Sequence, residues 1–163
     1  MKFAGLNAAA ISLSLMAAAC ATTPRPAPLF TPQQEAVLRA NRFVPTERGW
    51  EFSANDKLLF AFDDSKLKVD QIPVIQAIAG RLDAVAIMHA TIEGHTDATG
   101  AAAYNHQLSV RRAGAVAEAF ISGGFNREGI KVEGLGSRYP IESNDTREGR
   151  EENRRVVILI TTP

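Results

Sequence analysis

The polar residues that could do chemistry are concentrated in one segment, residues 93–100, which reads EGHTDATG. An apolar stretch that should form a strand precedes this segment, and a long helical pattern follows it. A glycine-containing segment at the carboxyl end of a strand, leading into a helix, is a common ligand-binding position in α/β sheets. The segment is not a phosphate-binding loop, because it has neither the Lys-Ser/Thr ending of a P-loop nor the GxGxxG spacing.

The helix after this segment carries a second set of polar side chains. Asn105, Ser109 and Arg112 recur at helical spacing, so they share one face of the helix. The angle between successive residues places Arg112 on the side opposite Val110 and Ala117, which are expected on the buried face. Arg112 is therefore expected to point away from the core, toward the loop side or toward solvent, and composition alone favours a solvent-facing arginine.

Spacing along the chain does not by itself bring Asp97 to Arg112. If the helix begins near Ala101, Arg112 lies about 16 Å along the helix axis. The preceding segment would have to fold back over the helix for the carboxylate to approach the guanidinium. The acidic and the basic side chain are thus two separate candidates at this level.

The elements that must position these residues follow from hydrophobic periodicity. Two short strands with a turn at Asn55-Asp56 are expected first, and strands and helices alternate after them. The expected strands are 50–52, 58–62, 85–93, 130–135 and 156–160, and the expected helices are 71–84 and 101–122. The apolar face expected for the longer helix comprises Val110, Ala113, Gly114, Ala117, Phe120 and Ile121. This order predicts an α/β fold, a mixed β-sheet with helices packed on it.

The last expected strand, residues 156–160, is apolar throughout, which is typical of a central strand covered on both faces. A polar loop rich in Arg, Glu and Asn, residues 137–155, comes before it. The sequence shows no internal repeat and no second core, so one domain is expected.

The N-terminal residues have the pattern of an export signal. Residues 1–19 have a single charge, Lys2, followed by an Ala- and Leu-rich stretch, as in a signal peptide. The string LMAAAC, residues 15–20, resembles a bacterial lipobox and predicts lipid attachment at Cys20, although Ala17 stands where Leu is more common. The alternative is ordinary cleavage after Ala19, which would leave a free thiol. Residues 20–44 are expected to form a lipidated, Pro-rich tether, and residues 45–163 the folded domain.

Composition excludes several function classes. The chain has 18 basic and 18 acidic residues, so it lacks the basic field that nucleic-acid binding usually needs. A single cysteine allows no intramolecular disulfide, no all-cysteine zinc site and no iron–sulfur cluster. The three histidines, His89, His95 and His106, show no metal-binding spacing. No metal and no cofactor is therefore expected.

Two blocks of sequence resemble the OmpA C-terminal-like domain family, which includes the peptidoglycan-associated lipoprotein. The first is EGHTDATGAAAYNHQLSVRRAGAV, which starts at Glu93, and the second is GSRYPIESNDTREGREENRRV, which ends at Val156. The blocks stand in the family's order, and the resemblance covers roughly residues 57–161. It implies a βαβαββ sandwich and a domain that binds peptidoglycan non-covalently.

The resemblance also implies a ligand and the residues that hold it. The ligand would be the meso-diaminopimelate of the stem peptide, with Asp97 on its ammonium group and Arg112 on its carboxylate. Asn105 would position the loop or contact the ligand, and Thr96 and Gly100 would offer backbone groups. Asp63 would be either a further ligand-facing residue or a turn residue. Asn153 and Arg154 are expected to be structural, holding the polar loop against the sheet.

The expected function is therefore that of an outer-membrane lipoprotein, facing the periplasm, that anchors the outer membrane to the cell wall and is not an enzyme. The alternative is a cell-wall hydrolase or amidase, with Glu93, His95 and Asp97 as its acid and base candidates. That alternative lacks a nucleophile elbow, GxSxG. A flagellar stator component, which carries the same type of domain, would need a retained transmembrane helix with an acidic residue. Envelope protein partners cannot be named from the sequence.

Overall fold

The computed structural model describes residues 29–60 and 64–163. The predicted signal peptide, Cys20 and Asp63 lie outside the described residues. Within these ranges, no helix is both long enough and apolar enough to cross a membrane.

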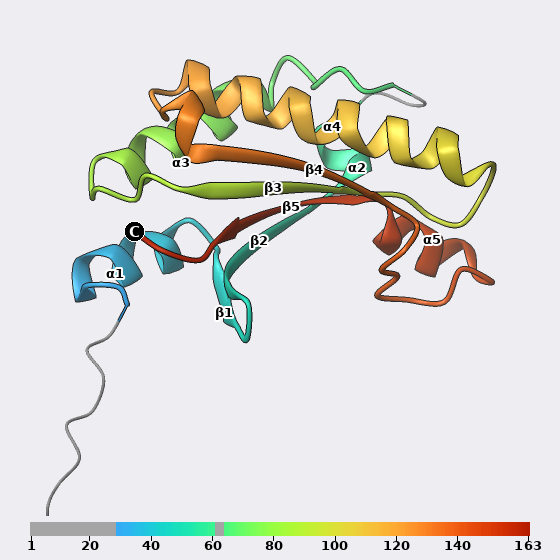
Figure 1. The fold of residues 1–163 in the computed structure, drawn as a ribbon, viewed down its shortest axis with the longest axis horizontal. Coiled ribbons are helices and arrows are strands. Elements are labelled where there is room, and N and C mark those ends of the chain that lie inside the picture. The colour runs from blue at the N-terminus through green and yellow to red at the C-terminus, as the bar shows by residue number, and fades with distance from the viewer. Residues whose placement is uncertain (1–28, 61–63) are drawn as a thin grey trace, which may run out of the picture.

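The fold is an α/β sandwich built on one five-stranded mixed sheet. Strands β3 and β4 are parallel and all other neighbouring pairs are antiparallel, in the order β1-β2-β5-β3-β4. Figure 1 shows α3 and α4 on one face of the sheet, with α1 near one end and α5 near the other. The strands are β1 (Val44–Thr46), β2 (Gly49–Asn55), β3 (Ala90–His95), β4 (Ile130–Gly136) and β5 (Arg155–Ile160). The predicted α/β class and the mixed sheet are confirmed.

The helices differ in length and in how they begin. The two long ones, α3 (Ile72–Asp83) and α4 (Ala102–Ser122), were both expected from their periodicity. The short ones are α1 (Pro32–Ala40), α2 (Asp56–Leu59), α5 (Arg147–Asn153) and a 3₁₀ turn, η1 (Arg127–Gly129). Helix α5 lies inside the segment predicted to be a polar loop, and Thr146 caps it by accepting a hydrogen bond from Gly149 N.

The hydrophobic core lies between the sheet and the two long helices. All six residues of β5 are buried, because β5 lies between β2 and β3, which confirms the predicted central strand. Ile75, Ile78, Ala79 and Leu82 form the buried face of α3 and recur at helical spacing. Burying a large aliphatic side chain contributes about 1.5–3 kcal/mol, so this core supplies most of the stabilisation that the site above it depends on.

Residues 58–60, the described part of the strand predicted over 58–62, do not form that strand. The side chain of Asn55 accepts a hydrogen bond from Lys57 N and starts α2, which ends at Leu59. After it, Phe60 makes one isolated bridge with Leu67. The hairpin partner of β2 is β1 instead. The polar pair Asn55-Asp56 is therefore a helix start and not a hairpin turn, which places Asp56 at the site described below.

The folded domain begins before Pro45, the boundary predicted from the sequence. Helix α1 has a capping box between Thr31 and Gln34. The side chains of Phe30, Leu38 and Phe43 are 6%, 0% and 2% exposed and belong to the main core cluster. The predicted tether therefore ends no later than Phe30. Helix α1, with 9 residues, is too short to be stable by itself and is stabilised by this tertiary packing.

Candidate ligand-binding site

A pocket of about 840 Å³ opens between the N-terminal half of α4, α2 and the segment around α5. Five of the residues predicted for the site line it: Thr96, Asp97, Gly100, Asn105 and Arg112. The structure thus brings together all the predicted ligand-facing residues that it describes. The pocket is also lined by residues that were not predicted, among them Asp56, Phe60, Arg150 and Arg154.

Asp97 is buried in the loop between β3 and α4, and its carboxylate accepts hydrogen bonds from two donors. Its Oδ1 accepts a hydrogen bond of 2.8 Å from Thr99 N, and its Oδ2 accepts one of 2.6 Å from Arg154. Burial by itself would raise the pKa of Asp97, but the hydrogen bonds from Arg154 and Thr99 outweigh it and lower the pKa. Asp97 is therefore an ionised carboxylate at neutral pH, suited to accept a cation.

Arg112 is buried, with a residue exposure of 5%, and does not face solvent as its composition suggested. Its Nε donates a hydrogen bond of 3.2 Å to the carbonyl oxygen of Asp64, and its guanidinium lies over the ring of Phe60, 5.2 Å from the ring centre. Its Nη1 is 3.3 Å from Asp56 Oδ2 but makes no hydrogen bond. Arg112 therefore has unused hydrogen-bonding capacity inside the pocket.

The reason for this error lies in which face of α4 is buried. The buried residues include Asn105, Ser109 and Arg112, whereas Val110 is 39% exposed. Three different segments cover the polar stripe: Asn105 contacts the loop between β3 and α4, Ser109 contacts the ends of β3 and β4, and Arg112 contacts α2 and the segment after it. Angular spacing identified the shared face of the three polar residues correctly but could not show that a second element covers it.

A close approach of α4 to β3 brings this polar stripe to the sheet. A Cβ added to Gly94 would lie 2.1 Å from the carbonyl oxygen of Ser109, so only glycine fits there. Ser109 Oγ accepts a hydrogen bond from Gly136 N and donates one to the His106 carbonyl. This contact fixes the helix over the ends of β3 and β4, and with it the height of Arg112 above the sheet.

Asn105 positions the loop that carries Asp97. Its Nδ2 donates to the carbonyl oxygens of Asp97 and Thr99, at 3.2 and 2.9 Å. Gly100 has a φ of +88°, a conformation that other residues rarely adopt. Thr96 N donates to Gly136 O, and its buried Oγ1 has no hydrogen-bond partner. The loop is also held by a second amide side chain, since Ala98 N donates to Asn144 Oδ1 at 3.0 Å, and the carboxylate of Asp97 is left directed at the pocket.

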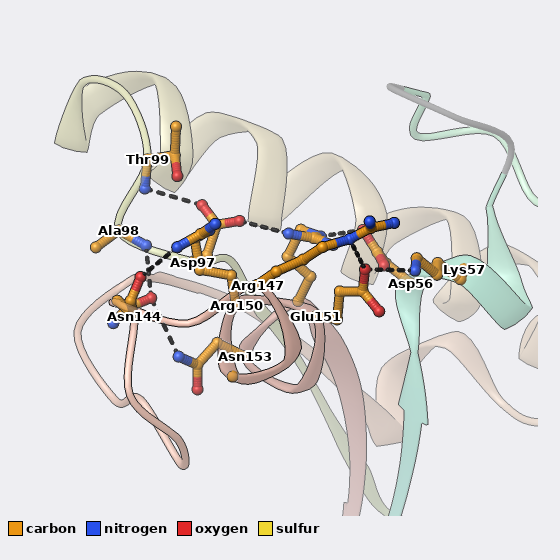
Figure 2. A network of polar contacts seen from close by, with 12 residues as sticks. Asp56, Lys57, Asp97, Ala98, Thr99, Asn144, Arg147, Arg150, Glu151 and Asn153 are labelled. Atoms are coloured by element: carbon orange, nitrogen blue, oxygen red, sulfur yellow. Dashed lines mark hydrogen bonds and ion pairs between the residues drawn. The ribbon is translucent and has the colours of Figure 1, made fainter.

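Asp97 and Arg112 belong to one network, although no direct contact joins them. Arg154 donates to Asp97 Oδ2 at 2.6 Å and to Asp56 Oδ2 at 3.1 Å, and Asp56 in turn lies 3.3 Å from Arg112. Figure 2 shows Asp97 and Asp56 at two points of this continuous chain of polar contacts. Asp97 therefore does not have to contact Arg112 directly, because Arg154 and Asp56 link the two side chains.

Two residues expected to be structural differ in their roles. Asn153 holds the polar loop, since its side chain accepts hydrogen bonds from Ile141 N and Glu142 N and donates to the Glu142 carbonyl. Arg154 instead contacts both acids of the pocket, so its assignment as a loop-holding residue is wrong. Asp56 was missed altogether. The signal that could have found it is Asn55 followed by an acidic residue, a common start of a helix.

The acid and base candidates for an enzyme are not brought together. Glu93 and His95 flank Gly94 on β3 and point away from α4, to the other side of the sheet. Glu93 pairs there with Arg48, while Asp97 lies in the pocket. In the described parts of the chain, no group of three or more His, Cys, Asp and Glu side chains could hold a metal ion.

Comparisons with known proteins agree with this fold. Residues 59–154 match the sequence profile of the OmpA family. The putative lipoprotein YfiB of Escherichia coli K12 is 42% identical over 135 residues, which cover 82% of this chain and 84% of that protein. The outer-membrane lipoprotein YfiB of Pseudomonas aeruginosa PAO1 is 41% identical over 155 residues, covering 95% and 92%. The crystal structure of the peptidoglycan-associated lipoprotein from Burkholderia pseudomallei is similar with a TM-score of 0.56 and 26% identity, covering 63% and 86%.

Proposed function

Because the chain belongs to the OmpA family, we propose that it is an outer-membrane lipoprotein that binds peptidoglycan non-covalently through the meso-diaminopimelate of the stem peptide. In this role it anchors the outer membrane to the cell wall from the periplasmic side. The observation that carries the proposal is one pocket lined by a buried carboxylate, Asp97, and a buried guanidinium, Arg112. The names of two relatives and of a structural neighbour, all lipoproteins, support it.

The chemistry of the ligand matches this pair of charges. The far end of diaminopimelate has an ammonium and a carboxylate on one carbon. The ionised Asp97 can accept the ammonium, and the planar guanidinium of Arg112 can take the carboxylate in a paired contact. Arg112 Nη1 is buried without a hydrogen bond, so a ligand oxygen there would satisfy a donor that the protein itself leaves unsatisfied.

The same pair explains why a lysine-type stem peptide would bind less well. Lysine provides the ammonium group for Asp97 but has no carboxylate for Arg112. Arg112 would then be covered by the ligand without gaining a partner, and that desolvation costs free energy. Selection against lysine-type wall is therefore expected to come from Arg112.

A binding role is also supported over a catalytic one. The two acid and base candidates that the sequence offers beside Asp97, Glu93 and His95, lie on the other side of the sheet. The pocket itself combines carboxylates and guanidinium groups, which suit recognition of a zwitterion. A binding protein with a lipid at one end and wall at the other gains from effective concentration, so each wall contact can be weak.

The experiment that tests the proposal is sedimentation of the purified protein with sacculi. Wild-type protein should sediment with diaminopimelate-type sacculi and much less with lysine-type sacculi, and it should release no muropeptides from either. Release of muropeptides would favour the hydrolase alternative. Equal sedimentation with both wall types would contradict recognition of diaminopimelate.

The lipid anchor is a separate part of the proposal and has its own test. Metabolic labelling with palmitate should mark the wild-type protein, and Cys20→Ser should abolish the label because acylation needs the thiol. Absence of label in the wild type would contradict the anchor while leaving the pocket assignment untouched.

A further inference from the structure

Arg154 is the most accessible member of the network that links the two proposed ligand contacts. Its side chain is 26% exposed, whereas those of Asp56, Asp97 and Arg112 are 11%, 11% and 6% exposed. It reaches Asp97 from the pocket side and occupies Oδ2, while the other oxygen, Oδ1, binds the Thr99 amide. The position that the ligand's ammonium group would take on Asp97 is thus filled by a cation of the chain itself.

Asp56 occupies the position on Arg112 that the ligand's carboxylate would take. One oxygen, Oδ2, faces both Arg112 Nη1 and Arg154 Nε, while the other oxygen, Oδ1, is buried without a hydrogen bond. Arg112 Nη1 also lacks a hydrogen bond. The contact between Asp56 and Arg112 is therefore incomplete on both sides, and a better-placed ligand carboxylate would replace it at little cost.

The two occupying groups are themselves paired, at 3.1 Å. Asp56 and Arg154 therefore present an anion to Arg112 and a cation to Asp97 as one joined unit, as the carboxylate and ammonium of a single ligand carbon would. We infer that Asp56 and Arg154 occupy the site as an internal substitute for the zwitterion. They are specificity-determining residues, because a zwitterionic ligand must displace both contacts. This inference rests on the proposed function and concerns the same pocket.

The arrangement acts differently on ligands with one charge and on ligands with two. A zwitterionic ligand replaces Arg154 on Asp97 and Asp56 on Arg112, and the displaced pair can remain joined. A ligand with only an ammonium group displaces Arg154 from Asp97 and leaves Asp56 on Arg112. Asp56 therefore weakens binding of the zwitterion more than binding of the single-charge ligand, because only the zwitterion has to displace it.

Asp56→Asn tests this directly, since it keeps the shape of the side chain and removes its charge. The probes are two muramoyl tripeptides, one ending in meso-diaminopimelate and one in L-lysine, titrated by calorimetry into the folded protein. We expect Asp56→Asn to bind the diaminopimelate tripeptide about fivefold more tightly than wild type, the scale of one hydrogen-bonded contact. Binding of the lysine tripeptide should improve less, so the ratio between the two probes should rise.

Glu151→Gln is the matched control for this charge change. Glu151 pairs at 2.6 Å with Lys57, the residue that follows Asp56 in the chain, and it does not contact Arg112. If Asp56 acts by direct occupancy, Glu151→Gln should change the affinity less than twofold. An equal gain in both variants would show a general change in potential and would overturn the inference.

Arg154→Gln is the second variant, and it keeps the inference testable if Asp56→Asn fails to fold. Freeing Asp97 should tighten binding of both tripeptides. Its control is Arg150→Gln, which removes the same charge from the same pocket. Arg150 is a suitable control because its side chain donates to the carbonyls of Asn144 and Asp145 and not to Asp97. We expect Arg150→Gln not to tighten binding.

The outcomes separate this inference from the proposed function. If wild type prefers the diaminopimelate tripeptide but Asp56→Asn and Arg154→Gln bind it no better or more weakly, the pocket assignment stands and internal substitution is wrong. If neither wild type nor any folded variant binds either tripeptide, both are wrong. Circular dichroism and melting temperature establish that each variant is folded.

Discussion

Two groups of buried charges lie on opposite sides of β3, and they differ in what they leave open. The first is the pocket network of Asp56, Asp97, Arg112 and Arg154. The second, here called the Glu93 cluster, consists of Arg48, Glu93, His95 and Arg155. Each combines residues in or next to β3 and β5 with residues from elsewhere in the chain. The first lines a pocket of about 840 Å³, whereas no residue of the second lines that pocket.

The Glu93 cluster is paired within the chain, although Glu93 Oε2 and both ring nitrogens of His95 are buried without a hydrogen bond. Glu93 pairs with Arg48, and Arg155 donates to the carbonyls of Asn153 and Tyr139. Burial by itself would raise the pKa of Glu93, but the neighbouring His95 and Arg48 outweigh it and lower the pKa. Burial also lowers the pKa of His95, against the raising effect of Glu93, so His95 is neutral at pH 7. The difference teaches that burial of charge does not mark a site unless the charges also face open space.

The largest effect that the comparison predicts is on binding through the pocket. Asp97→Ala and Arg112→Ala should each lose most sacculus binding, about 30-fold or more, because truncating one partner of a buried charge pair costs about 2–5 kcal/mol. Sedimentation with diaminopimelate-type sacculi measures this, with circular dichroism as the folding control. Folded variants that sediment like wild type would place wall binding on another surface.

The Glu93 cluster should show the reverse pattern. Glu93→Gln removes the negative charge that Arg48 and Arg155 face, so the free energy of unfolding should fall by about 1–3 kcal/mol. Sacculus binding of the folded protein should stay within twofold of wild type. Chemical denaturation and sedimentation of the same sample measure both quantities. A loss of binding without a loss of stability would break the distinction between the two regions.

Arg112→Lys sharpens the comparison by keeping the charge. A lysine ammonium cannot make the paired planar contact with a carboxylate, so affinity for diaminopimelate-type sacculi should fall by about tenfold. The discrimination between diaminopimelate-type and lysine-type sacculi should fall with it. Full retention of both would mean that Arg112 contributes only its charge.

The smallest effect concerns pH. The pKa of Asp97 is lowered in the folded protein, so its contribution to stability is present above its unfolded pKa, near 4, and is lost as pH falls through the folded pKa. Binding through the same carboxylate should follow that direction. Sedimentation should therefore change little between pH 7 and pH 5 and fall only below about pH 4. A midpoint above pH 5 would show that another group controls binding.

The sequence was sufficient for the long elements and for the main residues of the pocket. The period of α3, the apolar run of β5 and the helical spacing of Asn105, Ser109 and Arg112 each depend on local pattern, and the structure has them as expected. Asp97 and Arg112 were named from the resemblance, and both line the pocket.

What could not be predicted depends on contacts between distant segments. Arg112 was read as solvent-facing because nothing local shows that α2 covers α4. Asp56 and Arg154 meet across 98 residues of sequence, so their pairing leaves no periodic signal. Helix α1 is short, and the burial of Phe30 and Leu38 is decided by the core that they join. All three features depend on tertiary packing, which a local sequence pattern does not reveal.

The central claim, that this pocket holds the diaminopimelate zwitterion, is tested most directly by titrating ¹⁵N-labelled protein with the meso-diaminopimelate tripeptide. The account predicts that shifts concentrate on the amides of residues 96–100 and on the side-chain Nε signals of Arg112 and Arg154. Signals of the Glu93 cluster, including Arg48 Nε, should move little. Saturable binding whose shifts lie away from residues 96–100 and Arg112 would contradict the account.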